Sequence, residues 1–387
     1  MSALRLIRPL GRRLHCQPSG QILQCVKFPR VLCAFISSKA NMGDYKRPPP
    51  FPYKEVEYNR YYQVFDRTVD RFNENTKVLV VDGPIAAGKS TFAKQLAEEL
   101  DMLYFPEADL DMEYINAYGY DLRKLNPRLP VKAQFTDIRD ISRNPKHPNA
   151  GAVQMQMLQI RFEQYIDALA HLYNTGQGVV LDRSVYSDFV FMEAMFDGGY
   201  ISKEVKKNYD HHLEGIKVLA KRPHLVIYLD VPVKTVLERI KTRNRDWEVN
   251  SPLLTEKYLT KMERTYKLEF LRDMNVSSEV LVYDWSNFGE VDVVVEDIER
   301  LDFTEDPYSA KFEEWKIEHD RELGYERYGY TCEKDVMLEK VDPGHIVPEL
   351  LLSHEENLIL MKLKNEVGCE YDPGYNPNQG DSVLFKW

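Results

Sequence analysis

Short apolar runs alternate with longer, helix-like stretches between about residues 76 and 300. Five of these runs are continuous and rich in β-branched residues, and they lie at 77–82, 102–105, 178–182, 224–230 and 280–284. Continuous apolar runs of this length are typical of strands that are buried on both faces. The pattern therefore predicts an α/β fold in which helices cover both faces of a parallel sheet.

The longest helix is expected over about 152–175, because apolar residues recur there at spacings of three and four. The members of that pattern are Leu158, Phe162, Tyr165, Ile166, Leu169 and Tyr173. Between the second strand and this helix, residues 108–150 form an irregular segment that contains LNPRLP and RNPKHPN. Loops of that length in a compact domain are usually functional or attached to a partner.

Two flanking segments differ from the alternating region, which we assign to a domain at 76–300. Residues 37–75 are rich in proline and tyrosine, and three consecutive prolines favour an extended stretch on a surface. Residues 301–387 are charged and end in turn-forming residues followed by an apolar terminus, which comprises Val383, Leu384, Phe385 and Trp387. This C-terminal extension is expected either to dock on a partner or to pack back on its own domain.

The beginning of the chain resembles a targeting leader. Residues 1–40 carry seven Lys and Arg and no Asp or Glu, and apolar residues interleave with Arg5, Arg8, Arg12 and Arg13. This Arg-rich, acid-poor amphipathic pattern is typical of a mitochondrial transit peptide. We assign the transit peptide to 1–36 and expect cleavage somewhere near 31–40. The alternative is a disordered basic tail.

Charge and composition exclude several kinds of partner. The chain has 51 basic and 61 acidic residues, so without the seven basic residues of the leader 44 face 61, a net charge of −17. Such an acidic protein is a poor binder of nucleic acid or anionic lipid. No apolar run approaches the roughly 18–20 residues that span a bilayer. Cys332 and Cys369 are the only cysteines beyond residue 40, too few for a disulfide framework or a zinc site.

Residues 83–90, GPIAAGKS, fit the phosphate-binding pattern G-x-x-x-x-G-K-[ST] between a predicted strand and a predicted helix. In such a loop the backbone N–H groups surround a phosphate, the lysine reaches its outer oxygens, and the hydroxyl ligates Mg²⁺. The expected nucleotide-binding residues are Gly83, Ala86, Ala87, Gly88, Lys89, Ser90 and Thr91, and Ser90 is also an expected Mg²⁺ ligand. The alternative is a glycine turn with a solvent-facing lysine.

The third predicted strand leads into a second charged motif, LDRSVYSDFVF. Asp182 lies at the carboxyl end of the strand, where it is placed to hold Mg²⁺ through a bound water. Arg183 beside it is expected to face the phosphates or the phosphate acceptor. Alternatively, Arg183 only pairs with Asp182 or Asp188.

A third charged motif, VLERIKTRNRDWE, places Arg239, Arg243 and Arg245 on a helix and the turn after it. Arg239 and Arg243 are four residues apart, so they share a helix face and could close over a triphosphate as a lid. Arginines on helices are usually solvated, so this pattern gains weight only from following the two earlier motifs.

These motifs resemble, in this order, those of the deoxyribonucleoside kinases. The matching segments are GPIAAGKSTF, LDRSVYSDFVF, ERIKTRNRDWE, YLTKMERTYKLEFL and VLVYDWS. YFPEA, NTGQGVV, RPHLVIYLDVPV, VVEDIE and the terminal YDPGYN look more closely similar to the kinase-like accessory subunits of respiratory complex I. The resemblance implies a P-loop fold with a five-stranded parallel sheet and helices on both faces. It also implies a matrix-side subunit that associates with the inner mitochondrial membrane and binds other complex I subunits without carrying electrons.

The resemblance also assigns residues on the acceptor side of the site. The kinases carry a catalytic base in a Glu-Pro pair after the second strand and a base-reading glutamine on the long helix, which match Glu107 and Gln154. In this chain Pro106 precedes Glu107, so the backbone that delivers the carboxylate is expected to differ. Glu107 and Arg183 are expected to be catalytic only if the protein is an active kinase.

The phosphate-binding motifs are complete, whereas the acceptor side departs from the kinases. We therefore expect an accessory subunit that binds a purine nucleotide with Mg²⁺ for assembly or stability. The alternatives are an active mitochondrial kinase that phosphorylates purine deoxynucleosides with ATP, or a free matrix nucleoside kinase. FAD is ascribed to the accessory-subunit family, but no G-x-G-x-x-G motif supports it here.

Overall fold

The computed structural model describes residues 35–366 and Cys369, apart from 43–45, 60, 117–118, 305–308, 317–318, 342–343 and 345. Within these residues the chain forms a five-stranded parallel sheet with the strand order β2-β3-β1-β4-β5. The strands are β1 (Val78–Asp82), β2 (Leu103–Phe105), β3 (Val179–Asp182), β4 (Leu225–Asp230) and β5 (Glu279–Asp284). Each begins within one residue of its predicted position, so the predicted α/β fold is confirmed.

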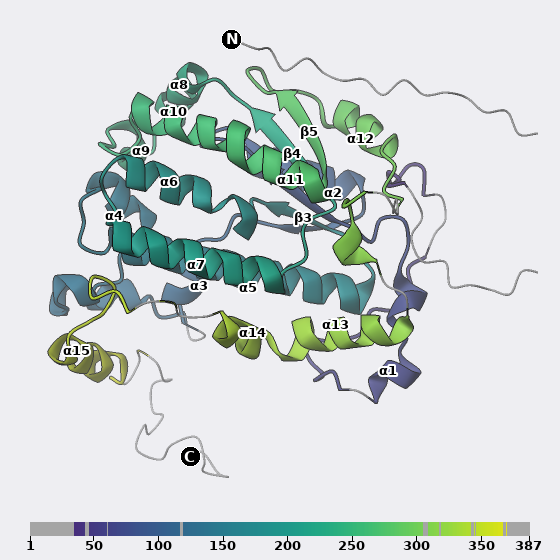
Figure 1. Cartoon of the computed structure of the whole chain (residues 1–387), viewed down its shortest axis with the longest axis horizontal. Coiled ribbons are helices and arrows are strands. Elements are labelled where there is room, and N and C mark those ends of the chain that lie inside the picture. Colours follow the sequence, from purple (N-terminus) through teal and green to yellow (C-terminus); the bar gives the residue numbers. More distant parts are fainter. Residues whose placement is uncertain are drawn as a thin grey trace, which may run out of the picture.

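Helices and sheet form a layered structure (Figure 1). The helices of the domain are α2 (Lys89–Glu99), α3 (Asp111–Tyr114), α4 (Ile138–Arg143), α5 (Ala150–Thr175), α6 (Phe189–Asp197), α7 (Lys203–Leu219), α8 (Val233–Arg243), α9 (Asp246–Val249), α10 (Glu256–Thr265), α11 (Leu271–Ser277) and α12 (Val291–Glu299). Helix α2 packs against β1, β2, β3 and α12, whereas α5, α6, α7 and α10 form a separate array of neighbouring helices. Every residue of β1 and β3 is buried, which accounts for their unbroken apolar sequences.

The long predicted helix is α5, and its end is fixed by a glycine. Gly176 has a φ of 69°, in the left-handed region that closes many helices. A Cβ at Gly176 would lie 2.1 Å from the Arg71 carbonyl oxygen, so no other residue fits. The sheet resumes at β3 directly after this turn.

Within the irregular segment 108–150, the described residues form only short helices and turns: α3, α4 and the 3-10 turns η2 (Leu122–Arg128) and η3 (Val131–Ala133). Helix α4 begins with a capping box, in which Asp137 accepts from the backbone of Asp140 and Asp140 accepts from the backbone of Asp137. The segment is therefore held by side-chain contacts rather than by regular structure.

Both extensions lie against the domain where the structure describes them. The N-terminal extension includes α1 (Tyr62–Phe65) and the 3-10 turn η1 (Thr68–Arg71). The C-terminal extension includes α13 (Asp320–Cys332) and α14 (Lys334–Lys340) along α5, and α15 (His354–Lys364) against η3. Its described residues thus pack on their own chain. The expected docking terminus at 370–387 lies outside the described residues, as do residues 1–34 of the leader.

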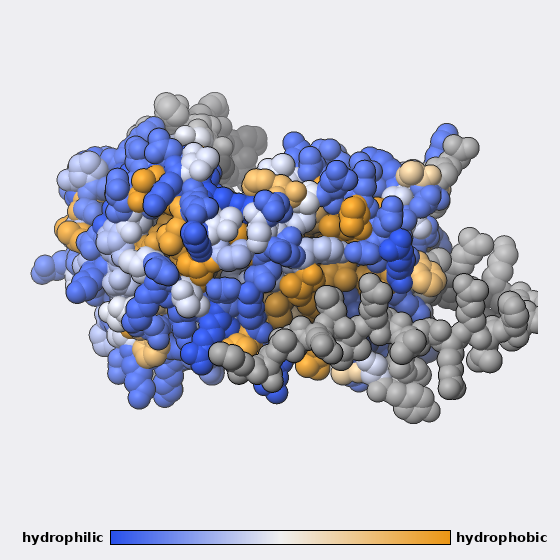
Figure 2. All heavy atoms as spheres, turned by 90° about the horizontal axis from the view of Figure 1, so that it is seen from above, coloured by the Kyte–Doolittle hydropathy of each residue, from blue (hydrophilic) through white to orange (hydrophobic). Residues whose placement is uncertain are grey.

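The surface in Figure 2 is mostly hydrophilic, with apolar side chains gathered in a few patches. Among the helices that the structure describes, none is both long and apolar enough to cross a bilayer. Cys332 and Cys369 are free thiols, as expected.

Candidate nucleotide-binding site

The loop between β1 and α2 has the backbone shape of a phosphate cradle. Gly83, Ala86 and Gly88 have φ values of 150°, 58° and 87°, so the chain turns repeatedly through conformations that favour glycine. A Cβ on Gly83 would lie 2.7 Å from the Leu229 carbonyl oxygen of β4. The loop therefore packs closely on the carboxyl ends of the neighbouring strands β1 and β4. Its backbone turns back at the amino end of α2, where N–H groups and the helix dipole favour an anion.

Lys89 begins α2 and folds back into this loop. Its Nζ donates to the Pro84 carbonyl oxygen at 2.9 Å, and only 6% of the residue is exposed. Burial, helped by the nearby Arg183, lowers the pKa of Lys89 to about 8. The ammonium group has one loop carbonyl as its hydrogen-bond partner, and a bound phosphate would supply stronger, charged acceptors.

Ser90 and Asp182 come together from α2 and the end of β3. The Ser90 hydroxyl donates to Asp182 Oδ2 at 2.5 Å, while the other carboxylate oxygen, Oδ1, is buried without a hydrogen-bond partner. Burial raises the pKa of Asp182, because the charged carboxylate has lost water. A hydroxyl beside an unsatisfied carboxylate oxygen is the hard-oxygen donor set that Mg²⁺ prefers when phosphates and waters supply its other ligands. These residues therefore fit the expected ion.

Glu107 lies just beyond β2, and two arginines hold its carboxylate. Its Oε1 is 2.8 Å from Arg183 Nε and 3.4 Å from Arg161 Nη2, and 41% of its side chain is exposed. Burial of the carboxylate opposes ionisation, but Arg183, Lys89 and Arg161 outweigh it and lower the pKa of Glu107 to about 2. The Pro106 carbonyl oxygen accepts from Gln164 Nε2 at 2.8 Å, which fixes the backbone before Glu107.

Arg183 has a φ of 67°, a left-handed conformation that is costly for arginine and is often found at functional sites. Its guanidinium is 3.1 Å from Asp82 Oδ1, contacts Glu107 and donates to the Tyr266 hydroxyl. The alternative in which it pairs with Asp182 or Asp188 is not the arrangement observed. Arg183 instead ties the end of β1 to the carboxylate after β2.

Gln154 belongs to a buried polar cluster between α5 and the start of α6. Its Nε2 donates to Asp188 Oδ2 at 3.0 Å, and the same carboxylate accepts from Tyr209 and pairs with Arg161. Asp188 is 0% exposed. Asp188, itself held by Tyr209 and Arg161, therefore orients the Gln154 side chain, and Arg161 connects this cluster to Glu107.

The three arginines of the predicted lid separate into two groups. Arg239 Nη1 donates to the Ala87 carbonyl oxygen at 3.3 Å, and its guanidinium lies 4.2 Å from the centre of the Phe288 ring. Arg243 and Arg245 instead pair with Glu248, at 2.5 and 3.4 Å. Arg239 alone of the three touches the phosphate loop.

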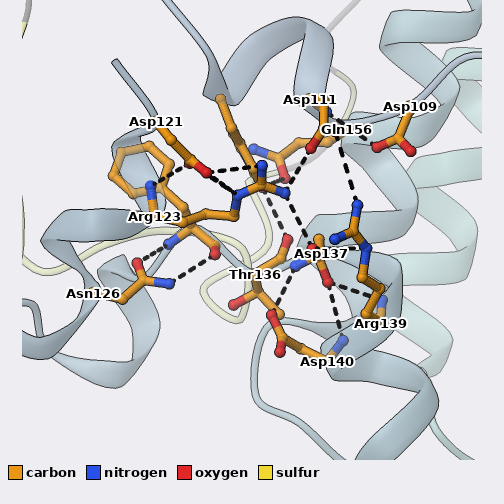
Figure 3. Close-up of polar contacts among 12 residues, drawn as sticks. Asp109, Asp111, Asp121, Arg123, Asn126, Thr136, Asp137, Arg139, Asp140 and Gln156 are labelled. Atoms are coloured by element: carbon orange, nitrogen blue, oxygen red, sulfur yellow. Dashed lines mark hydrogen bonds and ion pairs between the residues drawn. The ribbon is translucent and has the colours of Figure 1, made fainter. Parts of the chain in front are cut away.

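Segment 108–150 is held together by a network of ion pairs (Figure 3). Arg123 lies at its centre, 2.9 Å from Asp121, 2.6 Å from Asp111 and 3.2 Å from Asp137. Apolar side chains of η2, η3 and Leu129 between them pack against Leu363 of α15 and against Cys369, in a cluster of Leu122, Leu125, Leu129, Ala133, Leu363 and Cys369. The C-terminal extension therefore packs against this irregular segment.

Sequence reasoning missed four residues that complete this site: Arg161, Asp188, Phe191 and Tyr266. The Phe191 ring lies between two cations, with Arg161 and Arg183 at 5.0 and 4.9 Å from its centre. A signal existed for Arg161, since it follows Gln154 by seven residues, or two helical turns, on the same face of α5. Nothing local in the sequence indicates that Tyr266 meets Arg183.

A parallel sheet with a complete phosphate loop and charged residues at the carboxyl ends of β1, β2 and β3 defines a P-loop protein of the nucleoside-kinase type. Residues 79–315 match the family model described as deoxynucleoside kinase. A deoxyadenosine kinase structure from M. mycoides with bound dATP has a TM-score of 0.43 and 22% identity, covering 57% of this chain and 96% of that one.

The chain is also similar to proteins that are larger than this domain. It is 35% identical over 323 residues to the mitochondrial NADH dehydrogenase (ubiquinone) 1 alpha subcomplex subunit 10 of Mus musculus, covering 83% of this chain and 86% of that one. The deoxyguanosine kinase of Dictyostelium discoideum is 30% identical over 61% of this chain and 73% of its own length. The chain therefore belongs to the deoxynucleoside kinase family, in the branch that contains these alpha subcomplex subunits 10. The predicted resemblance is confirmed.

Proposed function

We propose that this chain is a non-electron-carrying accessory subunit of mitochondrial complex I that holds a purine nucleotide in its phosphate loop. It carries a mitochondrial leader, acts at the matrix side of the inner membrane, and binds other subunits of the complex. The nucleotide stabilises the fold and thereby the assembly of the complex. The expected cofactor is a purine nucleotide with Mg²⁺ rather than FAD.

Similarity outside the catalytic region supports membership in a complex. The kinase family model ends at residue 315, whereas the described C-terminal extension continues to α15. The murine subunit matches 83% of the chain, more than the 61% matched by the Dictyostelium kinase. The greater coverage by the murine subunit supports the proposal that the chain shares more than the kinase domain with the accessory subunits.

One observation carries the proposal: the phosphate side is complete, while the expected base is held as one half of an ion pair. Glu107 has a pKa of about 2, far below working pH. A general base works best when its pKa lies near the operating pH, so this carboxylate would be a weak acceptor for the proton of a sugar hydroxyl. In contrast, the burial of Lys89 beside the loop and the pairing of Ser90 with Asp182 support the binding of a nucleotide phosphate and its cation.

The residues for each part of the nucleotide follow from the geometry. The loop 83–88 and Lys89 hold the phosphates, and Ser90 and Asp182 hold the Mg²⁺, which would neutralise phosphate charge. Arg239 donates a hydrogen bond to the Ala87 carbonyl oxygen of the loop. Gln154 is the proposed reader of the base, and the purine preference rests on the purine deoxynucleoside kinases among the relatives.

The proposal is tested by measuring the nucleotide that copurifies with the protein. Native protein should release close to one purine nucleotide per chain on denaturation, identified by mass spectrometry. Lys89→Ala should release almost none, because the phosphates lose their buried cation. Lys94→Ala is the matched control, since Lys94 lies on the exposed face of the same helix. A full complement of nucleotide in Lys89→Ala would contradict the proposal.

The second candidate function is an active kinase that phosphorylates purine deoxynucleosides with ATP. The observation that favours it is that Glu107 lies near Lys89 of the phosphate loop, whose charge helps to lower its pKa. In that case Glu107 accepts the proton of the sugar hydroxyl and Arg183 stabilises the transferred phosphoryl group. Turnover of deoxyguanosine or deoxyadenosine that is lost in Glu107→Gln would establish this function instead.

A further inference from the structure

Residues 35–42 are part of the folded domain, although they overlap the end of the predicted leader (1–36) and the expected cleavage window (31–40). Ile36 is 1% exposed and belongs to the main hydrophobic core, and Ser38 is 7% exposed. Phe35 beside them is half exposed. The short segment therefore inserts the Ile36 side chain into the core and buries Ser38, whereas Phe35 is half exposed.

Asn75 connects this segment to the rest of the domain. The Ser37 N–H donates to Asn75 Oδ1 at 2.8 Å, and Asn75 Nδ2 donates to the Ser37 carbonyl oxygen at 2.6 Å. Asn75 Nδ2 also donates to the Leu100 carbonyl oxygen at 2.8 Å, and Asn75 is 0% exposed. Without Ser37, a fully buried amide would lose the partner of its oxygen, which is costly inside a protein.

Two further contacts fasten the segment to helix ends. The Lys39 N–H donates to the carbonyl oxygen of Glu99, the last residue of α2, at 2.8 Å. Ser38 N–H and Asn41 Nδ2 both donate to Glu299 Oε1, at 2.7 and 2.8 Å, at the end of α12. Residues 36–41 thus connect the ends of α2 and α12 with Asn75, which precedes β1. They lie at the amino ends of the strands, whereas the phosphate loop lies at the carboxyl ends.

We propose that the leader is removed on the amino side of Phe35 and that residues 35–42 stay with the mature protein as a structural plug. A processing endopeptidase adds water across one peptide C–N bond, giving a carboxyl end on the leader and an amino end on the mature chain. A cut within 36–40 removes Ile36 or the hydrogen bonds of Ser37 and Ser38. A cut between Phe35 and Ile36 places a charged amine on a residue that is 1% exposed. The expected window of 31–40 therefore narrows to bonds before Phe35.

This inference rests on the proposed mitochondrial leader but not on the proposed nucleotide site. The first test determines the amino terminus of the protein purified from mitochondria by intact mass and terminal peptide sequencing. The expected terminus is Phe35 or a residue shortly before it. A terminus at Ile36 or beyond overturns the inference, and so does a native chain that retains Met1. Bound nucleotide measured on the same sample reports separately on the proposed function.

The second test examines the plug itself. In the mature chain, Ile36→Ala should lower the melting temperature by about 5 °C, because a large-to-small change in a core is strongly destabilising. Phe35→Ala is the matched control and should change it by about 1 °C or less. A chain that begins at Ala40 should melt at least as far below the wild type as Ile36→Ala. Equal melting temperatures for the Phe35 and Ala40 starts would overturn the plug.

Discussion

Glu107 Oε1 lies 2.8 Å from Arg183 Nε, so the carboxylate that follows β2 is one partner of an ion pair rather than a free base. Its pKa is about 2, below the ordinary 4.5. A carboxyl group with a depressed pKa stabilises the fold above its unfolded-state pKa, and this contribution is lost as the pH falls toward the folded-state value. The stability that this ion pair contributes should therefore depend on pH.

Glu107→Gln should melt a few degrees below the wild type at pH 7, because Arg161 and Arg183 lose a charged partner. The difference should shrink as the pH falls from about 4.5 toward 2, where wild-type Glu107 takes up a proton. Thermal unfolding at several pH values checks this. Glu98→Gln, on the exposed face of α2, should show no such narrowing. A constant difference between Glu107→Gln and wild type would contradict the pairing.

Asp182 is expected to make nucleotide binding depend on Mg²⁺. Wild-type protein should bind ATP at least about tenfold more tightly with Mg²⁺ than with a chelator. Asp182→Asn should lose most of this difference, because a neutral amide is a poorer partner for the hydrated ion. Titration calorimetry with and without Mg²⁺ measures the effect.

Asp284→Asn is the control for this experiment, since Asp284 ends β5 on an exposed face. It should keep the full dependence on Mg²⁺. An unchanged Mg²⁺ effect in Asp182→Asn would exclude Asp182 from the ion site.

Arg239 and Arg243 share a helix but have different partners, so their variants should behave differently. Arg239→Ala should weaken nucleotide binding about tenfold, since the guanidinium contacts the Ala87 carbonyl oxygen of the phosphate loop. Arg243→Ala should change affinity less than about twofold, because Glu248 already holds this arginine. Equal losses in a fluorescent-nucleotide titration would show that the helix acts as a lid with both arginines.

The predicted lid of Arg239, Arg243 and Arg245 shows which features could be predicted from the sequence and which could not. Strands, the phosphate loop and α5 follow from local patterns: apolar runs, glycine spacing and helical periodicity. The spacing of Arg239 and Arg243 is correct for a shared face, but Glu248 is buried and turns Arg243 away from the loop. A helix pattern contains no information about such a competing partner.

The polar contacts of Arg161 and Arg183 were still harder to predict from the sequence, because they join residues that are far apart along the chain. Asp188 meets Arg161 across 27 residues, and Arg183 meets Tyr266 across 83. The burial of Ile36 likewise comes from tertiary packing, since an isolated isoleucine in a basic leader gives no periodic signal. Residues whose environment is set by distant elements need the folded chain.

The two extensions meet at Arg327, which gives a prediction about stability. Arg327 is 0% exposed, its Nη2 lies 2.7 Å from Asp66 Oδ2, and its guanidinium lies 4.0 Å from the centre of the Tyr58 ring. Removing one partner of a buried ion pair costs about 3 kcal/mol. Arg327→Met should therefore lower the melting temperature by about 4 °C or more. Arg321→Met, on the exposed side of α13, should lower it by about 1 °C or less.

Removal of residues 370–387 should leave the stability of the fold unchanged but should prevent assembly into the large membrane complex. The truncation keeps Leu363 and Cys369, which are 5% and 4% exposed in the cluster beneath α15, and it keeps the Arg128–Glu366 pair at 2.6 Å. The melting temperature and bound nucleotide should therefore stay unchanged. If the apolar terminus docks on a partner, the shortened protein should leave the large membrane complex on a native gel. In contrast, Leu363→Ala in a chain that retains residues 370–387 should lower the melting temperature. Unchanged co-migration of the truncated protein would mean that its partner surface lies within the described residues, on the domain or on α13 to α15.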